Sequence, residues 1–94
     1  MDLNGLDIKE SSIYCNAERY IEIRQITAMM QLNGQKGNWF WCGNGHTFMY
    51  DICYTERQPY ENGYKYVQTP LSYNEIPQYV LDYLRDNNYT YREQ

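Results

Sequence analysis

The clearest pattern of apolar and polar positions lies near the C-terminal end of the chain. Apolar and aromatic residues recur there at the spacing of one helix face, and charged or amide residues take the other side. The pattern predicts a helix over residues 74–87, begun by a capping box between Ser72 and Glu75, with Asn74 as an alternative cap. Pro77 is tolerated because it stands in or near the first turn. The apolar stripe consists of Ile76, Tyr79, Val80, Tyr83 and Leu84.

Residues 38–54 predict a β-hairpin. Two runs rich in aromatic and β-branched residues flank Gly43-Asn44-Gly45, and Asn-Gly favours a two-residue turn because type I′ geometry needs positive φ. Such a turn sets Trp39 opposite Tyr50. One face of the hairpin then carries Trp39, Trp41, Phe48, Tyr50 and Ile52, and the other carries Phe40, Cys42, Thr47, Met49, Asp51 and Cys53.

The turn decides which chemistry the hairpin can support. We expect the helix to dock on the tryptophan face, which leaves the other, half-apolar face open for a partner. A three-residue turn over residues 43–45 is the alternative, and it would place Cys42 opposite His46 on the same face.

The flanking segments carry weaker patterns. From Arg19 onwards polar and apolar residues alternate as in a half-buried strand, and the phase shifts at Ile26, which indicates a bulge or bend. A helix over residues 17–32 is the alternative. Residues 56–63 are rich in turn formers and predict a loop, followed by a short edge strand over residues 64–67.

Together these patterns predict one small α+β domain spanning residues 1–94. It comprises an irregular lead-in over residues 1–18, an antiparallel β-meander of three to four strands over 19–67, the helix over 74–87 packed on one face of the sheet, and a short tail over 88–94.

Composition modifies this picture in one respect. Of 94 residues 12 are tyrosines, and aliphatic residues are scarce, so tyrosine rings must fill much of the core while others lie on the surface.

The net charge is -4 and the basic residues are scattered, which argues against direct nucleic-acid binding and favours basic partners.

The sequence also indicates a compartment. It has no apolar run of about 18 residues and no basic leader with an apolar core, so we expect no membrane helix and no secretory signal. Three cysteines do not fit a closed disulfide framework. We therefore expect a cytoplasmic protein with reduced thiols, located in the host-cell cytoplasm if it is phage-encoded.

Cysteine and histidine are the candidates for chemistry. Cys42 and His46 have C-x3-H spacing, and a structural zinc site would need all four such residues of the chain: Cys15, Cys42, His46 and Cys53. The run W-C-G-N-G-H resembles the C-P-N-G-H end of small phage and bacterial zinc-ribbon proteins, but the leading C-x-x-C is missing. A Cys–His nucleophile is a further reading, although no residue is placed to stabilise an oxyanion. We expect buried thiols, no cofactor and no catalytic residue.

Aromatic residues outside the core patterns predict a binding surface, because tyrosine and tryptophan are enriched at interfaces. We expect a non-enzymatic inhibitor that binds another protein, in the style of anti-CRISPR-type phage proteins or toxin-immunity proteins, with a homodimer as a possible assembly. The alternatives are a small zinc-stabilised module and a protein that sequesters a nucleotide-like molecule in an aromatic pocket. The candidate partner-binding residues are Tyr54, Tyr60, Tyr64, Tyr66, Phe40, Met49, Tyr89 and Tyr91.

Overall fold

A computed structural model describes residues 2–10 and 17–93 of the protein. The described chain is mixed α+β, as predicted, but it forms six strands rather than three to four. They are accompanied by two α-helices and one turn of 3-10 helix. In chain order the elements are β1 (Ile8–Glu10), β2 (Arg19–Gln25), α1 (Ala28–Leu32), β3 (Trp39–Gly43), β4 (His46–Tyr60), β5 (Gly63–Pro70), η1 (Tyr73–Glu75), α2 (Gln78–Asp86) and β6 (Thr90–Tyr91).

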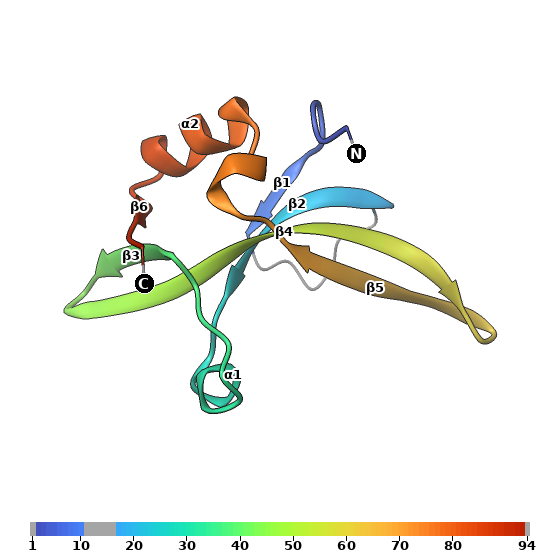
Figure 1. Ribbon diagram of the computed structural model, residues 1–94, viewed down its shortest axis with the longest axis horizontal. Coiled ribbons are helices and arrows are strands. Elements are labelled where there is room, and N and C mark those ends of the chain that lie inside the picture. The colour runs from blue at the N-terminus through green and yellow to red at the C-terminus, as the bar shows by residue number, and fades with distance from the viewer. Residues whose placement is uncertain (1, 11–16, 94) are drawn as a thin grey trace.

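The 15-residue strand β4 organises the sheet. β2 pairs with β4 along one edge, over residues 50–56. On the other edge β3 pairs with residues 46–50 and β5 with residues 53–60, so the two hairpins share β4 and diverge at Asp51 and Ile52. In Figure 1 β4 crosses the whole molecule, with α2 above the sheet and α1 projecting below it.

The first hairpin has the predicted two-residue turn. Asn44 and Gly45 have φ values of 53° and 78°, which glycine and asparagine adopt at low cost. Trp39 pairs with Tyr50, and Cys42 pairs with Thr47. The predicted register and the division of residues between the two faces are confirmed.

The predicted loop over residues 56–63 is wrong. β4 continues to Tyr60, which pairs with Gly63 across a second two-residue turn at Glu61 and Asn62. Glu61 takes the left-handed conformation (φ 51°), although the turn formers of this segment are the following Asn62 and Gly63. The strand predicted over residues 64–67 is consequently longer, Gly63–Pro70.

The phase shift at Ile26 marks the end of β2 and not a bulge within a longer strand. The Thr27 side chain accepts a hydrogen bond from the Met30 amide (3.3 Å) and so caps the short helix α1. Gly34 follows with φ of 85°, a conformation that ends helices. The region is therefore a strand followed by a five-residue helix, rather than the alternative helix over 17–32.

The C-terminal helix docks on the tryptophan face, as expected. The element predicted over 74–87 is divided, because Pro77 stands in extended conformation between η1 and α2. The Ser72 amide donates to the Glu75 carboxylate (2.8 Å), so this pair closes η1 and not the main helix. The buried core consists of Leu3, Ile21, Ile23, Trp39, Ile52, Tyr54, Ile76, Val80 and Leu84.

Two segments that were predicted to lie outside the sheet take part in it. In the lead-in over residues 1–18, β1 pairs in parallel with β2, and residues 11–16 lie outside the described part. In the tail over 88–94, β6 pairs with β3 through Tyr91 and Trp39. Both strands are too short to leave a local pattern.

The face opposite α2 is not open at its centre, contrary to expectation. Thr55 and Cys53 are fully buried there, and Glu22 is 8% exposed. The Glu22 carboxylate accepts hydrogen bonds from Thr55 (2.9 Å) and from Gln68 (2.7 Å). A satisfied polar network therefore occupies the middle of this face.

Candidate functional site

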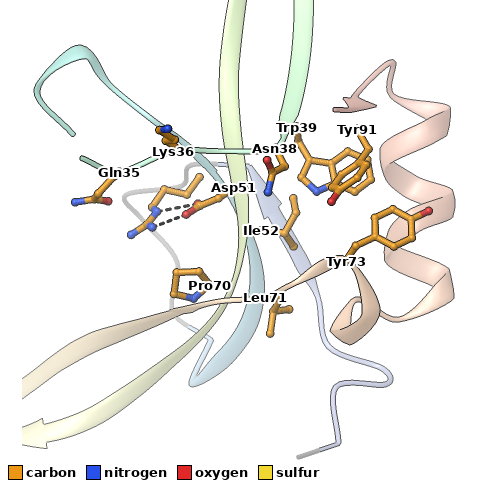
Figure 2. A pocket seen from close by; sticks show the side chains of 11 residues that line it. Gln35, Lys36, Asn38, Trp39, Asp51, Ile52, Pro70, Leu71, Tyr73 and Tyr91 are labelled. Atoms are coloured by element: carbon orange, nitrogen blue, oxygen red, sulfur yellow. Dashed lines mark hydrogen bonds and ion pairs between the residues drawn. The ribbon is translucent and has the colours of Figure 1, made fainter. Parts of the chain in front are cut away.

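The divergence of the two hairpins creates a hollow beside β4. Its volume is about 290 Å³. Asp51 and Ile52 lie where β4 has left β3 and has not yet joined β5, and the Leu71 amide closes the far end by donating to the Ile52 carbonyl (2.8 Å). Figure 2 shows the side chains converging from the α1–β3 loop, β4 and the segment after β5. The lining residues are Arg24, Gln35, Lys36, Asn38, Trp39, Asp51, Ile52, Pro70, Leu71, Tyr73 and Tyr91.

One side of the hollow is an aromatic wall formed by Trp39, Tyr73 and Tyr91. The Trp39 and Tyr73 rings are nearly parallel (8°), with centroids 6.1 Å apart, and Tyr91 lies 4.6 Å from Tyr73 and 5.2 Å from Trp39. Trp39 is 6% exposed, whereas Tyr73 is 45% exposed. The wall thus combines a fixed, buried ring with an accessible one.

The opposite side of the hollow carries a two-point ion pair. Arg24 donates through Nε (2.9 Å) and Nη2 (2.6 Å) to the two carboxylate oxygens of Asp51. Its Nη1 donates to Gln68 (3.1 Å). The hydrogen bond with Asp51 raises the pKa of Arg24 despite partial burial, which lowers it. The Asp51 carboxylate and the Arg24 guanidinium therefore bind each other, and their two charges cancel.

A second hollow lies beyond the aromatic wall, between α2 and β6. It is wider, about 600 Å³, and shares the three wall residues with the first. Its other lining includes Leu81 and the solvent-side pair of Arg85 and Asp82, 3.5 Å apart. The wall is thus accessible from two sides.

The structure divides the predicted partner-binding residues among separate places. Tyr60 (51% exposed), Tyr64 (60% exposed) and the half-buried Tyr66 lie on the β4–β5 hairpin. Phe40 and Met49 pair across the β3–β4 hairpin and are half-buried.

The remaining three predicted residues pack at or near the core. Tyr54 belongs to the buried core, and its hydroxyl accepts from Arg19 Nε (2.9 Å), so its prediction as a surface residue is wrong. Tyr89 packs edge-on against Tyr50, with ring centroids 5.1 Å apart, and Tyr91 belongs to the aromatic wall. The eight residues do not form one continuous surface.

Cys42 and Cys53 are not brought together. The Cys42 thiol lies at the exposed hairpin end, 3.3 Å from the Thr47 hydroxyl, whereas Cys53 is six residues beyond Thr47, about 20 Å along the strand. Burial and the nearby Asp51 carboxylate raise the pKa of the Cys53 thiol.

The predicted metal and nucleophile readings gain no geometric support. His46 pairs with Gly43, so it lies one position out of step with Cys42. Within the described residues no group of three or more His, Cys, Asp and Glu side chains is placed to hold a metal ion, and Cys15 lies outside them.

The most exposed apolar side chains were missed at the sequence level. Met29 (67% exposed) and Leu32 (80% exposed) lie on α1, whose five residues are all exposed or half-buried. Thr27 and Asn33-Gly34 are start and stop signals that would have revealed this helix. The exposure of Met29 and Leu32 could not be predicted, because the sequence of a short helix does not show whether another element packs on its apolar residues.

Comparisons of the chain with models of known protein families, with curated proteins and with solved structures found no match. In the described part of the chain, no helix has the length and apolar character needed to cross a membrane. Function is therefore inferred from the geometry of this chain.

Proposed function

We propose that the protein is a small, non-enzymatic module that binds another protein and inhibits it. The observation that carries the proposal is the exposure of Met29 and Leu32 on α1. Figure 1 shows this helix projecting from the sheet on the side away from α2. It adds apolar surface to the molecule without adding to the core.

The local sequence holds this exposed helix in shape. Thr27 caps its first turn, and the Asn33 amide donates to the carbonyls of Met29 and Met30 (both 3.1 Å) at its end. A preformed helix loses little conformational entropy on association. Burying a leucine or methionine side chain contributes about 1.5–3 kcal/mol, which the isolated protein does not gain here.

The end of the β4–β5 hairpin offers a second contact of a different kind. Tyr60 and Tyr64 are both more than half exposed, and cationic side chains lie over their rings: Lys65 at 4.6 Å from Tyr60 and Arg57 at 5.1 Å from Tyr64. Rigid aromatic rings are frequent anchors in protein interfaces. This supports the sequence-based choice of Tyr60 and Tyr64 as partner-binding residues, whereas the half-buried Tyr66 packs edge-on against Tyr20 and Tyr64.

The charge of the chain supports a particular kind of partner. With a net charge of -4, association with a basic surface is accelerated by electrostatic steering. A basic surface that normally binds nucleic acid would be blocked by such a module. We therefore propose an anti-defence or immunity type of inhibitor that acts in the cytoplasm.

The test is affinity capture from extracts of cells that express the protein, followed by mass spectrometry. The Met29→Ser/Leu32→Ser variant should lose a macromolecule that the wild type retains. Ala28→Ser/Gln31→Ser is the matched control, since both residues are exposed on the same helix. The captured partner, once purified, should lose activity when one equivalent of wild-type protein is added. Identical capture by all three proteins would contradict the proposal.

A further inference from the structure

We propose that the hollow between β3 and β5 binds a small planar aromatic molecule with a single negative charge, such as an aryl carboxylate. This site is separate from α1 and does not depend on the protein-binding proposal.

The aromatic wall selects a flat ligand. Trp39 is held in place by the core on one side and by Tyr91 on the other, so its ring cannot turn away from the hollow. Tyr73 lies nearly parallel to it and keeps 45% of its surface exposed. A planar ring stacked on the exposed face of Tyr73 or against Trp39 gains the offset or edge-on contacts that aromatic pairs prefer.

The polar side of the hollow selects one negative charge. Arg24 and Asp51 neutralise each other. Lys36, in contrast, has no ion-pair partner in the described part of the chain and lines the same hollow. With Arg24 and Lys36 positive and Asp51 negative, the lining has a net charge of +1.

Asn38 supplies the hydrogen bonds that would orient such a group. Its backbone carbonyl accepts from the Arg92 amide (2.7 Å), which fixes the backbone at this point. In Figure 2 the Asn38 side chain points between Asp51 and Trp39. Its amide has no hydrogen-bond partner among the described residues, so it is available to a carboxylate at the junction of the polar and aromatic sides.

The volume limits the size of the ligand. About 290 Å³ lies just below the range for drug-sized small-molecule sites, roughly 300–1,000 Å³. One unpaired cation does not match the charge of a di- or triphosphate. These two facts favour a ligand of about the size of indole carboxylate over a complete nucleotide. The sequence-based alternative, an aromatic pocket for a nucleotide-like molecule, is thereby limited to smaller ligands.

The probes for the test are indole-3-carboxylate and its neutral analogue indole-3-carboxamide. Each is titrated into the full chain while the NMR signal of the Trp39 indole N–H is followed, with Trp41→Phe used to assign it. We expect saturable shifts with a Kd on the order of 1 mM for the carboxylate, as suits a ligand of this size. The carboxamide should bind about fivefold more weakly.

Two pairs of variants test the assigned roles. Lys36→Gln should abolish the preference for the carboxylate, whereas Lys65→Gln, which removes an exposed charge from the distant hairpin end, should preserve it. Tyr73→Leu should weaken both probes, whereas Tyr64→Leu should weaken neither. The proposal is overturned if the Trp39 signal shows no saturable shift, if wild type binds both probes equally, or if Lys36→Gln keeps the preference.

Discussion

At the scale of single residues, burial decides which side chains are chemically available. Cys42 and Cys53 are identical in type and lie on the same face of the sheet, yet one is exposed and the other fully buried. The thiolate is the reactive form, and burial together with the Asp51 charge raises the pKa of Cys53. The thiol there acts as a small apolar group.

We therefore expect iodoacetamide at pH 8 to modify Cys42 rapidly and Cys53 only after denaturation. The measurement is the mass of the protein over time in a Cys15→Ser background, which leaves these two thiols. In the same background Cys42→Ser should abolish rapid labelling. Equal rates at both cysteines in the native protein would contradict the burial of Cys53.

The ion pairs that Asp51 and Arg57 of β4 form also differ in burial. In the Arg24–Asp51 pair the side chains are 18% and 14% exposed, whereas Glu18 in its pair with Arg57 is 77% exposed. Removing one partner of a partly buried pair leaves the other poorly solvated, but an exposed pair contributes little.

Asp51→Asn should consequently lower the free energy of unfolding by about 1–3 kcal/mol. Glu18→Gln, the matched control, should change it by less than about 0.5 kcal/mol. Urea denaturation followed by tyrosine and tryptophan fluorescence measures both. Similar small effects of the two changes would show that the Arg24–Asp51 pair is solvated.

At the scale of elements, local signals predicted those parts of the fold whose residues are close in sequence. Asn44-Gly45 set the turn and hence the register of the first hairpin, and the stripe from Ile76 to Leu84 set the buried face of the helix. In the second hairpin the left-handed residue is Glu61, one position before Asn62-Gly63. Glutamate is not a turn signal, so no local pattern indicated that β4 continues through Pro59.

Other elements exist only through pairing with distant segments. β6 is two residues long and forms because Tyr91 and Thr90 meet Trp39 and Phe40. The candidate binding hollow has the same origin: it requires β3 and β5 to leave β4 on one edge, and no local pattern encodes a divergence. That is why Tyr73, Lys36 and Asn38 were not assigned to a site from the sequence.

The entry to β3 supplies a test at this scale. A Cβ atom on Gly37 would lie 2.1 Å from the Tyr50 carbonyl oxygen, so the loop that carries Lys36 and Asn38 packs directly on β4. Gly37→Ala should lower the free energy of unfolding by about 1–3 kcal/mol, as overpacking does.

Gly63→Ala is the control for Gly37→Ala, because nothing lies within 4 Å of a Cβ atom there. It should change stability by less than about 0.5 kcal/mol. Thermal unfolding followed by circular dichroism compares the two. If Gly37→Ala were as stable as wild type, the loop would not pack against β4. The positions of Lys36 and Asn38 in the hollow would then not be fixed by that contact.

At the scale of the whole molecule, the core and the proposed protein-binding surfaces lie in different parts of the fold. The central section, where β2, β4 and α2 meet, holds the buried residues. β2 pairs with β4 from Tyr50 to Glu56, and the two hairpins extend β4 beyond these residues. The helix α1 projects below the sheet (Figure 1). A small domain with little aliphatic content thus has exposed apolar residues that its own stability does not use.

The most direct measurement of this claim is the free energy of unfolding of Met29→Ser/Leu32→Ser, compared with that of Leu84→Ala. Leu84 is fully buried, and its truncation should cost about 2–5 kcal/mol. The double change on α1 should cost less than about 0.5 kcal/mol, because its side chains are already in water. A loss of 2 kcal/mol or more from the α1 variant, by the same scale of core truncations, would show that the helix packs on the body of the protein and would remove the surface on which the proposed function depends.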